Sequence, residues 1–269
     1  MGINIKQKPS DISIDQIGYI KSIKPIEIAS KIDKEKLADK IEKRNFRGLI
    51  GQLSWATGMS RPDMSFSSCQ LSTMQSNPKM SDLVLANRTL NDLQRDNVSI
   101  KYVPLDISSV KLVVFADASF ANLTDGGSQG GHIIFLMDKH RHAVPLSWNS
   151  KRIRRVVRST LSAETLSTVD AVDSAYLLSN IITEIIGCSI DVDVYTDNRS
   201  LFDAVRTTNF LLDKRLRVEI SSLREMFDND EVKFHWIDTD RQLADVLTKK
   251  GASKYKLLSA LKEGKLDIE

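Results

Sequence analysis

Hydrophobic residues recur at helical intervals through the first hundred residues of the chain. The stretch "NFRGLIGQLSWATGM" spaces its apolar positions for one helical face, made of Phe46, Leu49, Ile50, Leu53 and Ala56 or Thr57. A break at "SRPDMS" predicts a second helix with Pro62 at its entry and Asp63 in its first turn, and a third helix begins after Pro78. The weak alternation in "SIDQIGYIKSIKPIEIAS" predicts strands. This region is therefore expected to be a small, mainly helical domain.

The pattern changes near residue 106, where strand-like runs begin. "VKLVVFADAS", "GGHIIFLMD" and "AVPLSWNS" predict three strands joined by short connections, which suits antiparallel neighbours. Residues 160–186 predict a long helix ending at Gly187, followed by a strand in "DVDVYTD". Short helices from about Asn198 and Asp213, a strand in "EVKFHWID" and a last helix from about Arg241 complete the pattern. The prediction is an α/β fold with a mixed five-stranded sheet and flanking helices over residues 107–269, preceded by a helical domain over residues 1–106.

Composition and charge limit the class of protein and the cellular compartment that we expect. The 269 residues are 41% hydrophobic and 27% charged, which suits a globular protein with a substantial core. Thirty-eight Lys and Arg against 35 Asp and Glu give a net charge of +3, which permits a polyanionic partner without requiring one. Cys69 and Cys188 lie far apart in apolar surroundings, so a disulfide framework or a cysteine zinc site is not expected. Because no apolar run has membrane-spanning length and the first residues lack a signal-peptide pattern, we expect an intracellular protein, cytoplasmic or nuclear, without a membrane partner.

Four carboxylates fall at the ends or beginnings of predicted elements. Asp117 ends the first strand of the sheet and Asp197 the fourth, while Glu164 and Asp245 lie in the first turns of the long helix and the last helix. Strand ends in such folds converge on one crevice, so these side chains are expected to meet. Clustered carboxylates repel one another unless a cation neutralises them, and oxygen-only ligands favour Mg²⁺ or Mn²⁺. Two such ions ~4 Å apart can activate a water and stabilise a leaving oxygen in phosphodiester hydrolysis.

Each carboxylate also has a purely structural interpretation. Aspartates at strand ends cap turns, and acidic residues in a first helical turn complement the helix dipole. Asp197 or Asn198 can serve as a helix N-cap in "VYTDNRS". Glu164 fits this interpretation less well, because its helix neighbours suggest a face turned toward the sheet. Taken one at a time, the structural interpretation is favoured, and only the order and placement of all four favour a metal site.

Five segments follow one another from about residue 110 onward: "VVFADASF", "PLSWNSKR", "RSTLSAETL", "VYTDNRS" and "QLADVLTK". In their order and spacing they resemble the ribonuclease H domain of copia-type retrotransposon polyproteins. The resemblance implies a ribonuclease H-like fold, two Mg²⁺ or Mn²⁺ ions held by Asp117, Glu164, Asp197 and Asp245, and cleavage of the RNA strand of an RNA/DNA hybrid. Arg215 departs from the family, which often carries a histidine at this position, and the departure bears on substrate handling or product release.

The first domain extends the resemblance. "NFRGLIGQLSWATGMSRPDMSFSSCQLSTMQSNP" is similar to the helical connection or thumb-like segment that follows the polymerase palm in the same polyproteins. No paired-aspartate polymerase motif precedes it, so no DNA polymerisation is expected from this chain alone. The resemblance implies the remainder of a Pol polyprotein as a partner.

Substrate contacts are expected from the densest basic run, "SKRIRRVVR", which directly precedes the helix carrying Glu164. A charge run is usually a solvated loop, but its place beside the candidate metal site favours phosphate contact. Asn149 can reach toward the 2′-hydroxyls that distinguish RNA from DNA. The predicted substrate-binding residues are Lys151, Arg152, Arg154, Arg155, Arg158, Asn149 and Asn198.

The sequence therefore predicts a two-metal endoribonuclease specific for RNA/DNA hybrids. Two alternatives remain. One is a catalytically inactive transposon-derived remnant or nucleic-acid-binding module that keeps the fold. The other is a different nuclease of the same fold, such as a junction resolvase, which cleavage of duplex DNA rather than hybrid would reveal.

Overall fold

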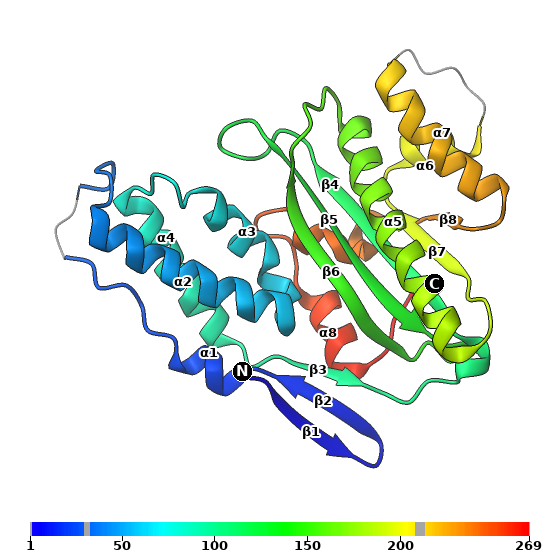
Figure 1. The fold of residues 1–269 in the computed structure, drawn as a ribbon, viewed down its shortest axis with the longest axis horizontal. Coiled ribbons are helices and arrows are strands. Elements are labelled where there is room, and N and C mark those ends of the chain that lie inside the picture. Colours follow the sequence, from blue (N-terminus) through cyan, green and yellow to red (C-terminus); the bar gives the residue numbers. More distant parts are fainter. Residues whose placement is uncertain (1, 30–32, 208–212, 269) are drawn as a thin grey trace. The chain divides into compact units, whose positions relative to one another are not determined.

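The computed structural model describes residues 2–29, 33–207 and 213–268, and Figure 1 shows its ribbon. The chain divides into two compact units, Met1–Lys101 and Tyr102–Glu269. The sequence placed this boundary slightly later, between residues 106 and 107. Each unit has its own sheet and its own helices.

The first unit combines a small sheet with a helical core. Its strands follow the order β1-β2-β3, and β1 pairs antiparallel with β2. A capping box between Asp39 and Glu42 begins α2, and the apolar face predicted for this helix is buried as expected. Part of the predicted N-terminal strand is wrong, because Ile17–Ser22 forms a helix that buries Ile20 in the core. The elements are β1 (Asn4–Lys8), β2 (Asp11–Asp15), α1 (Ile17–Ser22), α2 (Lys40–Met59), α3 (Ser65–Thr73), α4 (Met80–Arg95) and β3 (Ser99–Tyr102).

The second unit contains the predicted mixed five-stranded sheet, in the order β6-β5-β4-β7-β8. β4 pairs antiparallel with β5, and β5 with β6, whereas β4–β7 and β7–β8 are parallel. The predicted α/β class and its sheet are thus confirmed. The elements are β4 (Lys111–Ser119), β5 (Ser128–Met137), β6 (Ala143–Ile153), α5 (Thr160–Ile186), β7 (Val192–Thr196), α6 (Arg199–Arg206), α7 (Lys214–Asp228), β8 (Lys233–Trp236) and α8 (Tyr255–Glu263).

The long helix α5 covers one face of this sheet, in front of β4 and β5 in Figure 1, and α8 lies behind it. A glycine pair in β5 lets chain segments approach both faces closely. A Cβ at Gly130 would lie 2.9 Å from Ser167 Oγ on α5, and one at Gly131 would lie 2.7 Å from Leu247 Cβ. Alternate strand residues point to opposite faces, so each glycine makes room for a different segment.

The predicted helix from about Arg241 is wrong. Two 3-10 helices, Thr239–Arg241 and Leu243–Leu247, occupy this stretch, and α8 begins only at Tyr255. Gln242 holds the stretch against the sheet, because its Nε2 donates to the Ala116 carbonyl at 3.0 Å while its Oε1 accepts from Ala244 N. Gly251, with a φ of 78°, then turns the chain in a way that a helix does not allow. Within the described ranges, no helix has the length and apolar character needed to cross a membrane.

Candidate functional site

Three of the four predicted carboxylates come together beside the sheet. Asp117, Glu164 and Asp197 each contribute an oxygen, and these oxygens all lie within 4.8 Å of one another. Glu164 lies in the second turn of α5, and Asp197 directly follows β7. Asp117 does not end its strand as predicted, because Ala118 and Ser119 continue the pairing of β4 with β5. Elements far apart in the sequence thus converge on one acidic centre.

Burial makes this centre unfavourable for negative charge. Asp117 is completely buried and Glu164 is 4% exposed. Burial, together with the nearby charges of Asp245 and Asp197, raises the pKa of Asp117 to about 6, although Lys249 and Thr248 oppose the shift. Burial and the same crowding raise the pKa of Glu164 well above its ordinary value. Folding therefore holds these acids where ionisation costs free energy unless a cation is present.

One oxygen of Glu164 has no hydrogen-bond partner among the described residues. Glu164 Oε2 is buried, and no donor in the described part of the chain reaches it. A hydrogen bond from the backbone of Ala118 favours the Glu164 carboxylate. A buried acceptor without a donor is rare in folded proteins, because it forfeits the hydrogen bonds it had in water. Glu164 also contributes an oxygen to the cluster with Asp117 and Asp197, and such an all-oxygen set is the one that Mg²⁺ and Mn²⁺ prefer.

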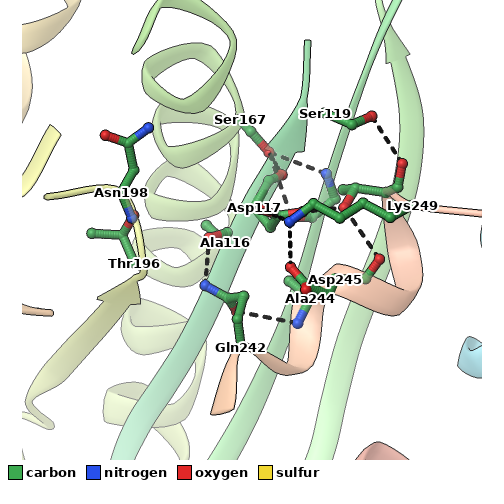
Figure 2. Close-up of polar contacts among 12 residues, drawn as sticks. Ala116, Asp117, Ser119, Ser167, Thr196, Asn198, Gln242, Ala244, Asp245 and Lys249 are labelled. Carbon is green, nitrogen blue, oxygen red and sulfur yellow. Dashed lines mark hydrogen bonds and ion pairs between the residues drawn. The ribbon is translucent and has the colours of Figure 1, made fainter. Parts of the chain in front are cut away.

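Asp245 approaches the centre through a lysine. Lys249 Nζ lies 3.2 Å from Asp117 Oδ1 and 2.7 Å from Asp245 Oδ1, and Figure 2 shows it between the two carboxylates. Thr248 Oγ1 donates to the other oxygen of Asp117. Burial alone would lower the pKa of Lys249, but attraction to Asp117 and a hydrogen bond to Asp245 raise it above its ordinary value. The pKa of Asp245 is raised, mainly by burial.

Hydrogen bonds fix the backbone around Asp117. Ser167 Oγ on α5 donates to the Asp117 carbonyl at 2.8 Å and accepts from Gly131 N at 3.1 Å (Figure 2). Ser119 Oγ donates to the Thr248 carbonyl at 2.9 Å. These bonds tie β4, β5, α5 and the segment after Leu247 together at one point, so the acidic side chains have little freedom to separate.

The predicted basic run lies partly in β6 and partly in the connection to α5. Three of its members already have acidic partners: Lys151 pairs with Asp170, Arg152 with Asp125 and Arg155 with Glu219. Arg154 and Arg158 are exposed, and no acidic partner for either occurs among the described residues. These two arginines are therefore the members of the run most available to an anion.

Arg215 shares a groove with this basic run. The groove has a volume of about 780 Å³ and lies between residues 155–158 and the beginning of α7. Its cationic lining residues are Arg155, Arg158, Lys214 and Arg215. The residue that departs from the family pattern thus adds positive charge beside the predicted phosphate contacts.

The two predicted asparagines have different environments. Asn149 is exposed on β6. Asn198 caps α6, since its Oδ1 accepts from Leu201 N at 3.0 Å, which agrees with the alternative considered from the sequence. A substrate contact by either residue stays a prediction.

Sequence reasoning missed Thr248 and Lys249. The signal was present, because Lys249 follows Asp245 by four residues in "ADVLTK", a spacing that brings side chains together on a helical turn. It was not recognised because the ion pair with Asp117 joins residues more than a hundred positions apart.

Curated relatives of this chain are transposon polyproteins. The chain is 25% identical over 271 aligned residues to the retrovirus-related Pol polyprotein from transposon RE1 of Arabidopsis thaliana, covering 93% of this chain and 18% of that protein. It is 29% identical over 144 residues to the transposon Ty1-NL2 Gag-Pol polyprotein of Saccharomyces cerevisiae, covering 52% of this chain and 8% of the relative. The chain spans less than a fifth of the length of these relatives. It is homologous to a segment of retrotransposon Pol polyproteins. No family model matches it.

Solved structures with partial similarity include ribonucleases H. The N-terminal ribonuclease H domain of rv2228c from Mycobacterium tuberculosis is 17% identical, covers 52% of this chain and 91% of that chain, and has a TM-score of 0.39. LC11-RNase H1 in complex with an RNA/DNA hybrid is 14% identical, covers 51% and 94%, and has a TM-score of 0.41.

Proposed function

We propose that this chain is the nuclease-bearing segment of a retrotransposon polyprotein and cleaves the RNA strand of RNA/DNA hybrids. The observation that carries the proposal is the convergence of three carboxylate oxygens within 4.8 Å, including a side chain with a buried, unpartnered oxygen. The transposon polyprotein relatives and the motif order described above support the same activity.

The acidic centre fits divalent metal ions. Every candidate ligand is a carboxylate, and the absence of nitrogen and sulfur ligands from the set favours a hard ion, Mg²⁺ or Mn²⁺. Asp117, Glu164 and Asp197 would hold the ions, and Asp245 would complete the set. When bound, two such ions supply activation of a water and stabilisation of the leaving oxygen.

The chain's own groups position the substrate and the ligands. Ser167 and Thr248 hold Asp117 in place, from its carbonyl and its carboxylate respectively. Arg154 and Arg158 would contact backbone phosphates, and Arg215 would extend this contact along the groove. Phosphate contacts of this kind carry no base preference, so cleavage should depend weakly on sequence.

The first unit has a supporting role in this proposal. We assign it to the helical connection segment that its sequence resembles, and the alignment with the RE1 polyprotein over 93% of the chain supports this assignment. Its buried ion pair, Arg61 with Asp63, has a structural role, because Arg61 also donates a hydrogen bond to the Leu93 carbonyl. We therefore assign it substrate positioning without chemistry of its own.

The test is a cleavage assay on a hybrid whose RNA strand is labelled, with Mg²⁺, with Mn²⁺ and with EDTA. Duplex DNA and duplex RNA of the same sequence serve as matched substrates. Metal-dependent cleavage of the hybrid RNA alone is the expected result. Cleavage of duplex DNA would identify a different nuclease of this fold, and metal binding without cleavage of any substrate would identify an inactive remnant.

A further inference from the structure

Lys249 occupies a position that requires explanation beyond the ligand set. Its ammonium group contacts two acidic side chains from different parts of the fold, Asp117 in β4 and Asp245 in the 3-10 helix Leu243–Leu247. The contacts measure 3.2 and 2.7 Å, so both are direct. Lysine is a compact point charge on a flexible stem, which suits it to sit among oxygens as a small cation does.

The ammonium group compensates part of the charge of the centre. Without it, Asp117 would face the charges of Asp245 and Asp197 with the hydroxyl of Thr248 as its one side-chain donor in the described part of the chain. Like charges at this separation in a poorly solvated site repel strongly. Lys249 therefore stabilises the metal-free fold.

A divalent ion bound by the same carboxylates would face the opposite situation. The ammonium charge then repels the ion, and both compete for the oxygens of Asp117 and Asp245. Lys249 has a route away from the centre, because its side chain is 36% exposed. Thr248 has no such route, since it is completely buried.

We propose that Lys249 is a built-in counter-ion that occupies the acidic centre in the metal-free protein and is displaced when a divalent ion binds. The inference rests on the metal site of the proposed function, but not on the substrate. Metal binding is then an exchange of one cation for another. The lysine lowers the affinity for metal and stabilises the metal-free folded protein. Metal uptake is thereby coupled to movement of one side chain.

Magnesium binding to the full-length protein tests the exchange. Lys249→Met removes the ammonium group, and Lys250→Met removes the same charge from the adjacent exposed residue as a matched control. We expect Lys249→Met, stripped of metal, to melt below Lys250→Met and to bind MgCl₂ at least roughly ten-fold more tightly by calorimetry. Lys249→Arg keeps the charge and should bind Mg²⁺ no more tightly than the parent.

A second measurement uses the unaltered protein and does not depend on a variant folding. The side-chain NMR signal of Lys249 should move toward that of a free lysine on saturation with Mg²⁺, while that of Lys250 stays unchanged. Equal or weaker Mg²⁺ affinity in Lys249→Met, or a Lys249 signal unmoved by saturating Mg²⁺, overturns the inference. If the exchange occurs but the parent cleaves no hybrid, the proposed function fails while this inference stands. If the parent cleaves hybrid while its Lys249 signal does not respond to Mg²⁺, the inference fails while the proposed function stands.

Discussion

Replacement of Asp117 by asparagine should separate stability from activity. The substitution keeps the shape of the side chain and removes a charge from a completely buried position. Of the three clustered carboxylates, only those of Glu164 and Asp197 then remain to bind a divalent ion. We therefore expect metal-dependent cleavage to be lost while the metal-free protein becomes more stable.

The magnitude follows from the pKa of the Asp117 carboxyl. Burial raises it from 3.8 to about 6 in the folded protein. Well below pH 4 the acid is protonated in both the folded and the unfolded chain, so it does not destabilise the fold. Well above pH 6 it is ionised in both, and the folded state is destabilised by the full difference, which is ~3 kcal/mol at ~1.4 kcal/mol per pKa unit. The asparagine variant should recover part of this, ~1–3 kcal/mol near pH 7.5 and almost nothing near pH 3.

Asp193 provides a control of opposite sign. It is 4% exposed on β7, but Lys111 Nζ lies 2.6 Å from its Oδ2. Burial alone would raise the pKa of Asp193, yet the nearby His235 ring and a hydrogen bond from Lys111 lower it below its ordinary value. Its ionised form therefore stabilises the fold above the unfolded pKa, and this stability is lost as pH falls through the folded pKa. Asp193→Asn should destabilise the protein near pH 7.5.

Urea unfolding of the parent and both variants, in EDTA and at several pH values, measures these differences. Added Mg²⁺ should stabilise the parent near pH 7.5 and the Asp117→Asn variant much less, because binding to the folded state alone shifts the unfolding equilibrium. The reasoning is refuted if Asp117→Asn is less stable than the parent in EDTA at neutral pH, or if it cleaves hybrid at the parental rate.

Two further predictions concern the substrate surface and the unit boundary. The double variant Arg154→Ala, Arg158→Ala should bind hybrids of all sequences more weakly, and the slope of log affinity against log salt concentration should become shallower by ~2. Lys262→Ala on α8 should leave this slope unchanged. An unaltered slope in the double variant would mean that the basic run is a solvated loop without phosphate contacts. A chain beginning at Tyr102 should fold and melt at least ~3 °C above one beginning at Ser108, because residues 102–107 include Leu105, which packs against the core of this unit, and Asp106, which pairs with Lys139 at 2.8 Å; equal calorimetric melting temperatures would contradict this.

The spacing of hydrophobic residues and local end signals predicted several helices correctly. The buried face of α2 and the end of α5 at Gly187, which adopts a φ of 75°, both follow from residues close together in the sequence. The antiparallel pairing of the first three strands of the five-stranded sheet followed from their short connections. Where the pattern was weak, as at Ile17–Ser22, burial of Ile20 decided the structure, and sequence spacing could not reveal that burial.

Asp245 shows the limit of local reasoning at the site. Its position was predicted as a first helical turn, and the helix is absent because Gln242 anchors the segment to Ala116 of β4. That anchor joins positions 126 residues apart, and no spacing rule contains it. The carboxylate still reaches the centre, because Lys249 connects it to Asp117.

The direction of the pKa shifts distinguishes the two interpretations of these acids that the sequence left open. An aspartate that serves a structural role accepts hydrogen bonds, as Asp106 does from Lys139 and Ser108, and its pKa is lowered. Asp117 and Glu164 have pKa values raised by burial, and Glu164 Oε2 has no donor among the described residues. A capping aspartate stabilises the folded state, whereas these two carboxylates destabilise it in the absence of metal. Their placement therefore supports the proposed role of these two residues as metal ligands rather than as caps.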